Sequence, residues 1–145
     1  MSKVIFVKDV MSPRVRTVAE GKTVYDAAKL MAKWRIGSLV VTKGDTPVGV
    51  ITEGDVSRCV AKGLDPRRTP AKAGRRKLVT ADPADRLEVA ARTMAAAGVK
   101  KLPVIDGTRL VGIITQTDIV DSTFELVTSL KEMVRARFRP PDFEP

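Results

Sequence analysis

Apolar and polar positions along the chain follow an order that occurs twice. In its first occurrence, apolar residues at helical spacing over 23–35 predict an amphipathic helix. The apolar runs 36–42 and 47–51, separated by a polar turn, predict two strands. Thr52 can then cap a further helix. With the extended stretch 15–18 in front, the pattern predicts a unit of strand, helix, strand, strand and helix.

The second occurrence of this order lies in the second half of the chain. The Asp-Pro pair at 82–83 has the pattern of a helix N-cap followed by proline at the first helical position. A helix is therefore predicted to begin there and to end at Gly98, a common C-terminal residue. Strands are predicted at 99–105 and 109–114, and Thr115 can cap the final helix.

Two terminal stretches lie outside these units. Residues 3–7 are expected to form a short strand or arm, and residues 9–13 a single helical turn that its proline stops. Beyond the last helix cap an apolar stripe continues, and it is expected to pack on the core or on another subunit. Its members are Val120, Phe124, Val127, Val134 and Phe138.

The two occurrences are copies of one another. Residues 17–55 align with residues 80–118 at a constant offset of 63 without a gap, and 13 of the 39 aligned pairs are identical. The stretch Gly49–Asp55 returns as Gly112–Asp118, with its Gly, Thr and Asp in the same places. Such a fixed offset indicates an internal duplication.

The repeated motif has the form Gly-h-h-Thr-x-x-Asp, where h is apolar. It brings a strand into a helix N-terminus, where backbone N–H groups are unpaired. A carboxylate at that place can accept hydrogen bonds from a ribose diol, and the hydroxyl and N–H groups can hold a phosphate. The same spacing is also that of a structural capping box. The glycines Gly49 and Gly112 allow another backbone or a flat ring to come close.

Composition narrows the chemistry. The chain has no His and one Cys, Cys59, which excludes Ser-His-Asp and Cys-His nucleophiles and zinc sites built from His and Cys. The helical pattern around Cys59 predicts a buried structural thiol. A formal net charge of +9 favours anionic partners such as nucleotides, nucleic acid or an acidic protein surface.

Residues 62–77 break the composition with seven Lys or Arg against one Asp, and they are rich in Pro and Gly. We expect a surface connector. One interpretation is a solvated loop that adds a general positive field. The other is a phosphate or nucleic-acid contact formed by its clustered cations. Those cations are Arg67, Arg68, Arg75, Arg76 and Lys77.

Several pieces of the chain, in order and spacing, resemble a tandem pair of CBS domains (a Bateman module). They are residues 7–13 before 15–18, the Ala-Ala-x-x-Met-Ala helix, residues 102–106 and both repeated motifs. The resemblance implies an α/β fold in which two β-α-β-β-α repeats pack by a pseudo-twofold through their sheets and leave two clefts. The chain then divides into repeat 1 (1–63), the basic connector (64–77), repeat 2 (78–121) and a C-terminal helix and tail (122–145).

The resemblance also implies a function: a non-enzymatic regulatory module that binds AMP, ADP, ATP or S-adenosylmethionine as a ligand, with no required cofactor. Asp55 and Asp118 would hold ribose hydroxyls, and Thr52 and Thr115 would lie at ribose or phosphate. The remaining expected ligand-binding residues are Thr17, Val18, Ile36, Gly37, Ser38, Thr80, Ala81, Val99, Lys100 and Lys101.

The two expected clefts are not equivalent. Gly37-Ser38 in one repeat corresponds to Lys100-Lys101 in the other, which suits at least one cleft to a phosphorylated ligand. The alternative is that both lysines are solvated charges at a strand end. The second repeat also departs from the family at its lead-in, where residues 70–74 replace the pattern of residues 7–11.

We expect a homodimer that reports to an effector protein, since the sequence offers a CBS pair alone. No apolar run suits a membrane span and the N-terminus has no signal-peptide pattern, so a cytoplasmic protein is expected. The alternative function is a nucleic-acid-binding adaptor that uses the basic connector, although no helix-turn-helix, zinc finger or aromatic RNA-binding motif accompanies it. A catalyst is the weakest hypothesis, because the chain has neither His nor a P-loop.

Overall fold

A computed structural model describes residues 4–74, 76–123, 128 and 132 of the chain. The first half contains α1 (Val7–Val10), β1 (Thr17–Ala19), α2 (Val24–Trp34), β2 (Ser38–Lys43), β3 (Thr46–Thr52), α3 (Glu53–Ala61) and α4 (Ala71–Gly74). The second half contains α5 (Leu87–Ala97), β4 (Lys101–Asp106), β5 (Arg109–Thr115) and α6 (Gln116–Ser122). The duplicated order of helix, strand, strand and helix predicted from the sequence is confirmed, and the strand that leads it is β1 in the first repeat and a single bridge at Ala81 in the second.

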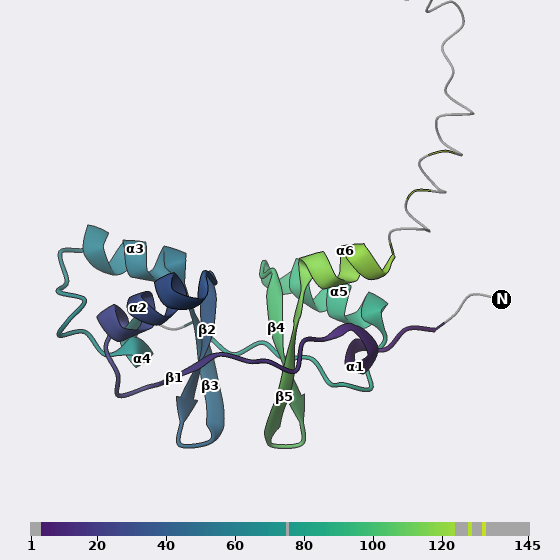
Figure 1. The fold of residues 1–145 in the computed structure, drawn as a ribbon, viewed down its shortest axis with the longest axis horizontal. Helices are drawn as coiled ribbons and strands as arrows, with labels where there is room; N and C mark the ends of the chain where they lie inside the picture. Colours follow the sequence, from purple (N-terminus) through teal and green to yellow (C-terminus); the bar gives the residue numbers. More distant parts are fainter. Residues whose placement is uncertain (1–3, 75, 124–127, 129–131, 133–145) are drawn as a thin grey trace, which may run out of the picture.

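Two small sheets face one another at the centre of the molecule (Figure 1). In the first sheet β1 lies at the edge and pairs in parallel with β2, which pairs antiparallel with β3. The second sheet is the antiparallel hairpin β4–β5, and Ala81 bridges to Val104 in parallel where the first sheet has Val18 beside Val41. Contacts join β3 to β5, so the two repeats meet through their sheets around a pseudo-twofold axis.

Each repeat has its own apolar core between sheet and helices. Leu39, Val41 and Ile51 fill the first core, and their counterparts Leu102, Val104 and Ile114 fill the second; all six are essentially buried. Cys59 is a buried free thiol of the first core, as predicted. Successive side chains of a strand point to opposite faces of its sheet, so core residues two apart on one strand share the face that the helices cover.

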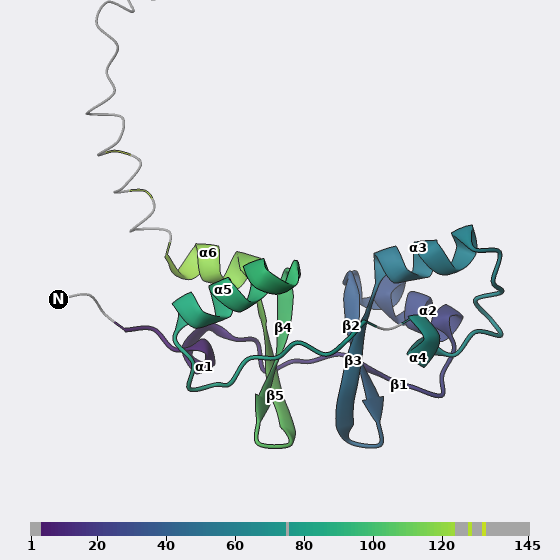
Figure 2. The same cartoon turned by 180° about the vertical axis from the view of Figure 1, so that it is seen from behind.

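The short segments before each repeat cross to the other one. Val7 of α1 is fully buried in the second core, and Ala71 of α4 is fully buried in the first. Figure 2 shows α1 on the side of the second repeat and α4 on the side of the first, and contacts join α1 to α6 and α4 to α2. The connector is therefore not wholly a surface segment, although its residues 62–65 are exposed.

The crossing segments also satisfy the helix N-termini with backbone hydrogen bonds. The Leu87 N–H donates to the Ile5 carbonyl at 3.1 Å, and the Val24 N–H donates to the Thr69 carbonyl at 2.8 Å. An N-terminal N–H group needs such a partner when it is buried. The two halves are thus tied together by backbone as well as by apolar contacts.

Two local predictions were wrong. The helix predicted to begin at the pair 82–83 begins at Leu87, because Asp82 closes a turn instead: its carbonyl accepts from the Asp85 N–H at 3.0 Å and its carboxylate from the Ala84 N–H at 2.8 Å. The first helical turn spans Val7–Val10 and ends before the expected residues 9–13 do.

The C-terminal stripe falls almost wholly outside the described residues. Phe124, Val127, Val134 and Phe138 are not among them, and Val120 on α6 is 52% exposed. The predicted division at 63/64, 77/78 and 121/122 stays a prediction.

The close approach at Gly112 yields a stability prediction. A Cβ on Gly112 would lie 2.7 Å from Sδ of Met11 and 2.9 Å from the Ser12 carbonyl oxygen, which is held by its bridge to Ile113. We expect Gly112→Ala to lower the free energy of unfolding by about 1–3 kcal/mol, because the backbone must shift. Thermal or urea unfolding measures this loss.

The matched control is Gly21→Ala, since a Cβ there meets nothing within 4 Å and its φ is not positive. It should change the free energy of unfolding by less than about 0.5 kcal/mol. Equal effects of the two substitutions would contradict the packing assigned to Gly112.

Candidate functional site

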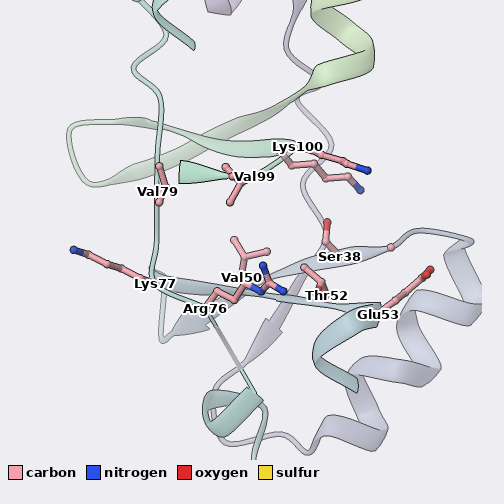
Figure 3. A pocket seen from close by; sticks show the side chains of 12 residues that line it. Ser38, Val50, Thr52, Glu53, Arg76, Lys77, Val79, Val99 and Lys100 are labelled. Atoms are coloured by element: carbon pink, nitrogen blue, oxygen red, sulfur yellow. The ribbon is translucent and has the colours of Figure 1, made fainter. Parts of the chain in front are cut away.

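A large hollow lies between the two repeats, where the starts of β2 and β4 come together (Figure 3). Its volume is about 530 Å³, which is within the usual range of roughly 300–1,000 Å³ for small-molecule sites. Residues from both repeats and from the connector line it. They are Gly37, Ser38, Val50, Thr52, Glu53, Arg76, Lys77, Val79, Gly98, Val99, Lys100 and Lys101.

The cavity combines an apolar wall with a cationic rim. Val50, Val79 and Val99 supply the apolar side chains (Figure 3). Four cations surround these valines, and one acidic residue, Glu53, also lines the cavity. The cations are Arg76, Lys77, Lys100 and Lys101. Such a lining suits a flat, largely apolar ring system that carries anionic groups.

The polar end of the cavity is a helix N-terminus. Thr52 ends β3 and caps α3, and its hydroxyl oxygen accepts from the Asp55 N–H at 3.3 Å. The Glu53 N–H donates to the Gly37 carbonyl at 3.0 Å, which fixes the end of β2 against the first turn of α3. The partial positive charge of a helix N-terminus adds to the field of the four cations.

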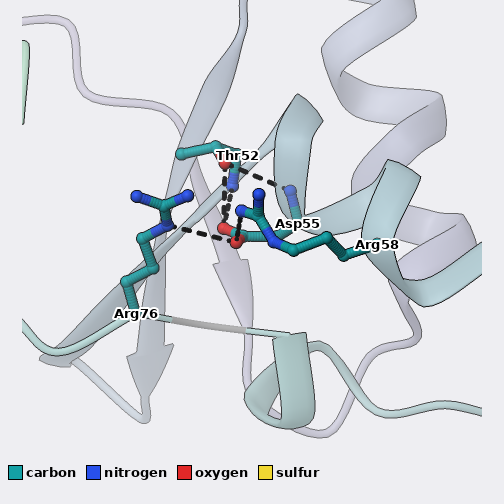
Figure 4. Close-up of polar contacts among 4 residues, drawn as sticks. All are labelled: Thr52, Asp55, Arg58 and Arg76. Atoms are coloured by element: carbon teal, nitrogen blue, oxygen red, sulfur yellow. Dashed lines mark hydrogen bonds and ion pairs between the residues drawn. The ribbon is translucent and has the colours of Figure 1, made fainter. Parts of the chain in front are cut away.

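Asp55 lies behind this end, and its carboxylate is fully engaged (Figure 4). One oxygen accepts from the Thr52 N–H at 2.8 Å and from the Thr52 hydroxyl at 2.9 Å. The other accepts from the guanidinium of Arg58 at 2.6 Å and from Nε of Arg76 at 3.2 Å. Four donors match the four acceptor positions of a carboxylate. Asp55 is only 6% exposed, and it lines a separate pocket of about 180 Å³.

The charge state of Asp55 follows from these contacts. Burial raises its pKa, but the hydrogen bonds from Arg58, Thr52 and Arg76 outweigh burial, so the pKa lies below its ordinary value of 3.8. The carboxylate is therefore ionised at neutral pH, and Arg76 is held between Asp55 and the cavity.

Asp118 repeats the cap without the arginines. One of its oxygens accepts from the Thr115 N–H at 2.8 Å, and its own N–H donates to the Thr115 hydroxyl at 3.1 Å. The position of Arg58 is taken by Asp121, and Ser12 bridges to Ile113 where Arg76 bridges to Val50. Within the part of the chain that the structure describes, no arginine pairs with Asp118.

The structure brings some of the predicted site residues together and separates others. The predicted residues that line the cavity are Gly37, Ser38, Thr52, Val99, Lys100 and Lys101. Thr115 and Asp118 form the equivalent cap of the second repeat. Thr17 and Val18 lie in another groove, against α2. Ile36 packs against the first core, Ala81 is buried in the second, and Thr80 is exposed.

Sequence reasoning missed half of the lining. The residues not predicted are Val50, Glu53, Arg76, Lys77, Val79 and Gly98. Val50 and Glu53 lie inside the repeated motif Gly49–Asp55, so the motif itself could have indicated them. Arg76 was noticed only as part of the connector charge, since its contact with Asp55, 21 residues away, is a tertiary one.

The connector cations do not gather in one place. Arg76 pairs with Asp55, Lys77 lines the cavity, and Arg67 lies 4.8 Å from the centre of the Tyr25 ring. Arg68 lies 3.9 Å from Asp65, and Arg75 is outside the described residues. The connector therefore divides its charge between the cavity and the outer surface of the first repeat.

Comparison with known proteins shows that both halves of the chain match one family of domains. A sequence model of the CBS domain matches residues 7–62 and again residues 73–125. A CBS domain-containing protein of Bacillus subtilis is 32% identical over 114 residues, which are 78% of this chain and 81% of that protein. A homoserine O-acetyltransferase of Methanohalobium evestigatum is 32% identical over 116 residues, but this chain spans only 23% of its length.

A solved structure adds a likeness in three dimensions. The CBS domain protein of Pyrobaculum aerophilum in complex with AMP is 27% identical, with a TM-score of 0.77 over 86% of this chain and 99% of that one. Among the described residues of this chain, no helix has the length and apolar character to cross a bilayer. Nor do those residues include a group of three His, Cys, Asp or Glu side chains placed to hold a metal.

The Asp55 cluster predicts a pH-dependent stability. Its lowered pKa means that the ionised carboxylate stabilises the fold above pH 3.8, and that this stabilisation is lost as the pH falls through the lower folded value. Asp55→Asn should cost about 1–2 kcal/mol at pH 7, because the half-exposed arginines lose a charged partner. Thermal unfolding between pH 7 and pH 3 should show this difference from wild type shrinking below pH 4.

Asp118→Asn is the matched control, since no arginine among the described residues pairs with Asp118. At pH 7 it should lower the free energy of unfolding by less than Asp55→Asn does, because it removes no ion pair to a described arginine. An Asp55→Asn difference that stays constant down to pH 3 would contradict the assigned ion pairs.

Proposed function

Because the chain belongs to the CBS domain family, whose sequence model covers both of its halves, we propose that it is a regulatory module without catalytic activity. It binds adenosine-containing ligands in the cavity between its repeats and reports their presence to a partner. One observation carries this proposal: a cavity of about 530 Å³ between the repeats joins an apolar wall to a rim of four cations.

The lining suits the parts of an adenine nucleotide. The adenine ring fits the apolar wall of Val50, Val79 and Val99, where its burial removes apolar surface from water. The phosphates fit the cations of the rim, to which they would make charge-assisted hydrogen bonds. A nucleotide with more phosphates gains more from this rim, whereas the sulfonium cation of S-adenosylmethionine is repelled by it. We therefore favour AMP, ADP or ATP as the ligand.

The relative from Pyrobaculum aerophilum supports this choice, because its structure was determined with AMP. That relative is 27% identical and shares the fold over most of both chains. The complex of this relative supports an adenine moiety in the ligand. Our preference for a ligand with several phosphates depends only on the four cations of this chain's cavity.

The ribose would reach Asp55 only by exchange. All four acceptor positions of the carboxylate are taken, so ribose hydroxyls must replace the donors Arg58 and Arg76. Arg76 already lines the cavity, and once released it can turn to a phosphate. Ligand binding would thereby pull on the connector, which packs on the first core through Ala71. This movement is the proposed signal.

The cap of the second repeat would bind differently. Asp118 has no arginine to displace among the described residues, so its carboxylate can accept a ribose hydroxyl without exchange. It also lacks a neighbouring Arg76, since Ser12 holds that place. We propose that the two caps differ in affinity and that the Thr52 side prefers the more highly phosphorylated ligand.

The recipient of the signal is a further part of the proposal. We propose an effector protein or a second copy of this chain as the partner that senses the connector. The alternative of a nucleic-acid adaptor based on the connector loses support, because the described connector cations point to separate places.

Calorimetric titration with AMP, ADP, ATP, S-adenosylmethionine and adenosine tests the ligand class. We expect affinity to rise with phosphate number and S-adenosylmethionine to bind most weakly. The double variant Lys100→Gln/Lys101→Gln should weaken ATP binding at least about tenfold, the equivalent of about 1.4 kcal/mol, and change adenosine binding little. Unchanged ATP affinity would leave both lysines as solvated charges at a strand end.

Arg76→Gln tests the exchange at Asp55. It should raise the affinity for adenosine, because the carboxylate is easier to reach, and lower the affinity for AMP and ATP about tenfold, because a phosphate partner is lost. Arg68→Gln is the control, since Arg68 lies in the same connector without touching Asp55 or the cavity. A parallel loss of adenosine and ATP affinity in Arg76→Gln would contradict the exchange.

A further inference from the structure

A second hollow of about 430 Å³ lies on the outer side of the first repeat. Residues of α2, of β1 (the edge strand of the first sheet) and of the turn between them line it. Figure 1 shows where α2 and β1 lie. No residue of this groove lines the cavity between the repeats. Its lining residues are Thr17, Val18, Ala19, Lys22, Asp26, Lys29, Leu30 and Lys33.

The groove is cationic. Lys22, Lys29 and Lys33 are all exposed. Lys29 and Lys33 are four residues apart on α2, so they lie on one face, roughly 6 Å apart along the axis. The single acid, Asp26, is already engaged, because its carboxylate accepts from the Thr23 N–H at 3.1 Å and lies 3.5 Å from Lys29. The lysines therefore present an excess positive charge along the groove.

Aromatic rings adjoin these lysines at both ends of α2. Tyr25 and Trp34 are the only Tyr and the only Trp of the chain. The Lys29 ammonium lies 4.9 Å from the centre of the Tyr25 ring, and that of Lys33 lies 5.9 Å from Trp34. Each ring also carries a guanidinium, with Arg67 at 4.8 Å from Tyr25 and Arg16 at 4.3 Å from Trp34. Both planar groups can stack on a nucleobase.

Comparison with the second repeat shows whether the repeated fold itself requires these side chains. At the offset of 63, the groove lysines correspond to Asp85, Arg92 and Ala96. The two rings correspond to Glu88 and Ala97. The same helix and turn positions of the second repeat therefore carry neither the lysine row nor the rings. The repeat architecture does not require this set of side chains, which gathers on one repeat only.

We propose that this groove binds single-stranded nucleic acid. The lysine row would neutralise successive phosphates, and the ring and guanidinium pairs at either end would stack on unpaired bases. A duplex keeps its bases stacked on one another and so gains nothing from the rings. An acidic polypeptide could pair with the lysines but offers no bases for both stacks, which makes it the less suitable occupant.

Fluorescence anisotropy with a labelled 12-nucleotide single strand, in RNA and DNA forms, tests this proposal between 50 and 200 mM KCl. The groove variant is Lys22→Gln/Lys29→Gln/Lys33→Gln. The control variant, Lys72→Gln/Arg92→Gln/Arg109→Gln, removes the same charge from exposed positions elsewhere.

The groove variant should bind at least about tenfold more weakly at 100 mM KCl. Its slope of log affinity against log salt should fall in magnitude by about 2, since three phosphate contacts contribute about 0.7 each. The control variant should keep most of the wild-type slope. The strand should also quench Trp34 emission in the wild type, and Tyr25→Leu should weaken binding without changing the salt slope.

Three results would overturn the proposal. The first is equal binding by the groove and control variants, which would reduce the effect to net charge. The second is binding of the matching duplex as tight as that of the single strand, and the third is equally tight binding of a glutamate 12-mer. Titration of the groove variant with ATP keeps this test separate from the nucleotide cavity, because ATP affinity should be unchanged.

Discussion

Neither half of this molecule is complete without a segment from the other, and this exchange shapes everything else. Val7 fills the core of the second repeat and Ala71 fills the core of the first. The backbone of the same segments satisfies the N-termini of α2 and α5. Because buried N–H groups and apolar cores are both costly to leave open, the two repeats cannot separate without exposing each other. The cavity between them is therefore a fixed feature of the fold.

The crossing of these segments also explains why the helix caps at Asp55 and Asp118 have different neighbours. The segment that crosses to the first repeat continues into Arg76 and Lys77, whereas the one that crosses to the second continues into Ser12 and Pro13. Only the first places a guanidinium on a buried aspartate and a cation on the cavity rim. The short stretches that lead into the repeats thus give the two caps different side chains, although the fold is duplicated.

Much of this could be predicted from the sequence, and the exceptions have physical causes. The duplication and the Thr caps at positions 52 and 115 follow from local patterns, and the structure has both. The start of α5 was predicted wrongly, because Asp82 closes a turn and the Ile5 carbonyl, from the N-terminal segment, accepts from the Leu87 N–H where no side chain caps the helix. Arg76 was not assigned to the site, since its contact with Asp55 depends on the crossing of the chain and not on spacing.

We propose that an adenine nucleotide occupies the cavity between the repeats. A crystal structure of the protein with saturating ATP tests it most directly. We expect the adenine ring to lie against Val79 and Val99, and the phosphates to lie among Lys77, Lys100 and Lys101. We expect Arg76 to be detached from Asp55. An empty cavity at saturating ATP, with Arg76 still 3.2 Å from the Asp55 carboxylate, would contradict this proposal.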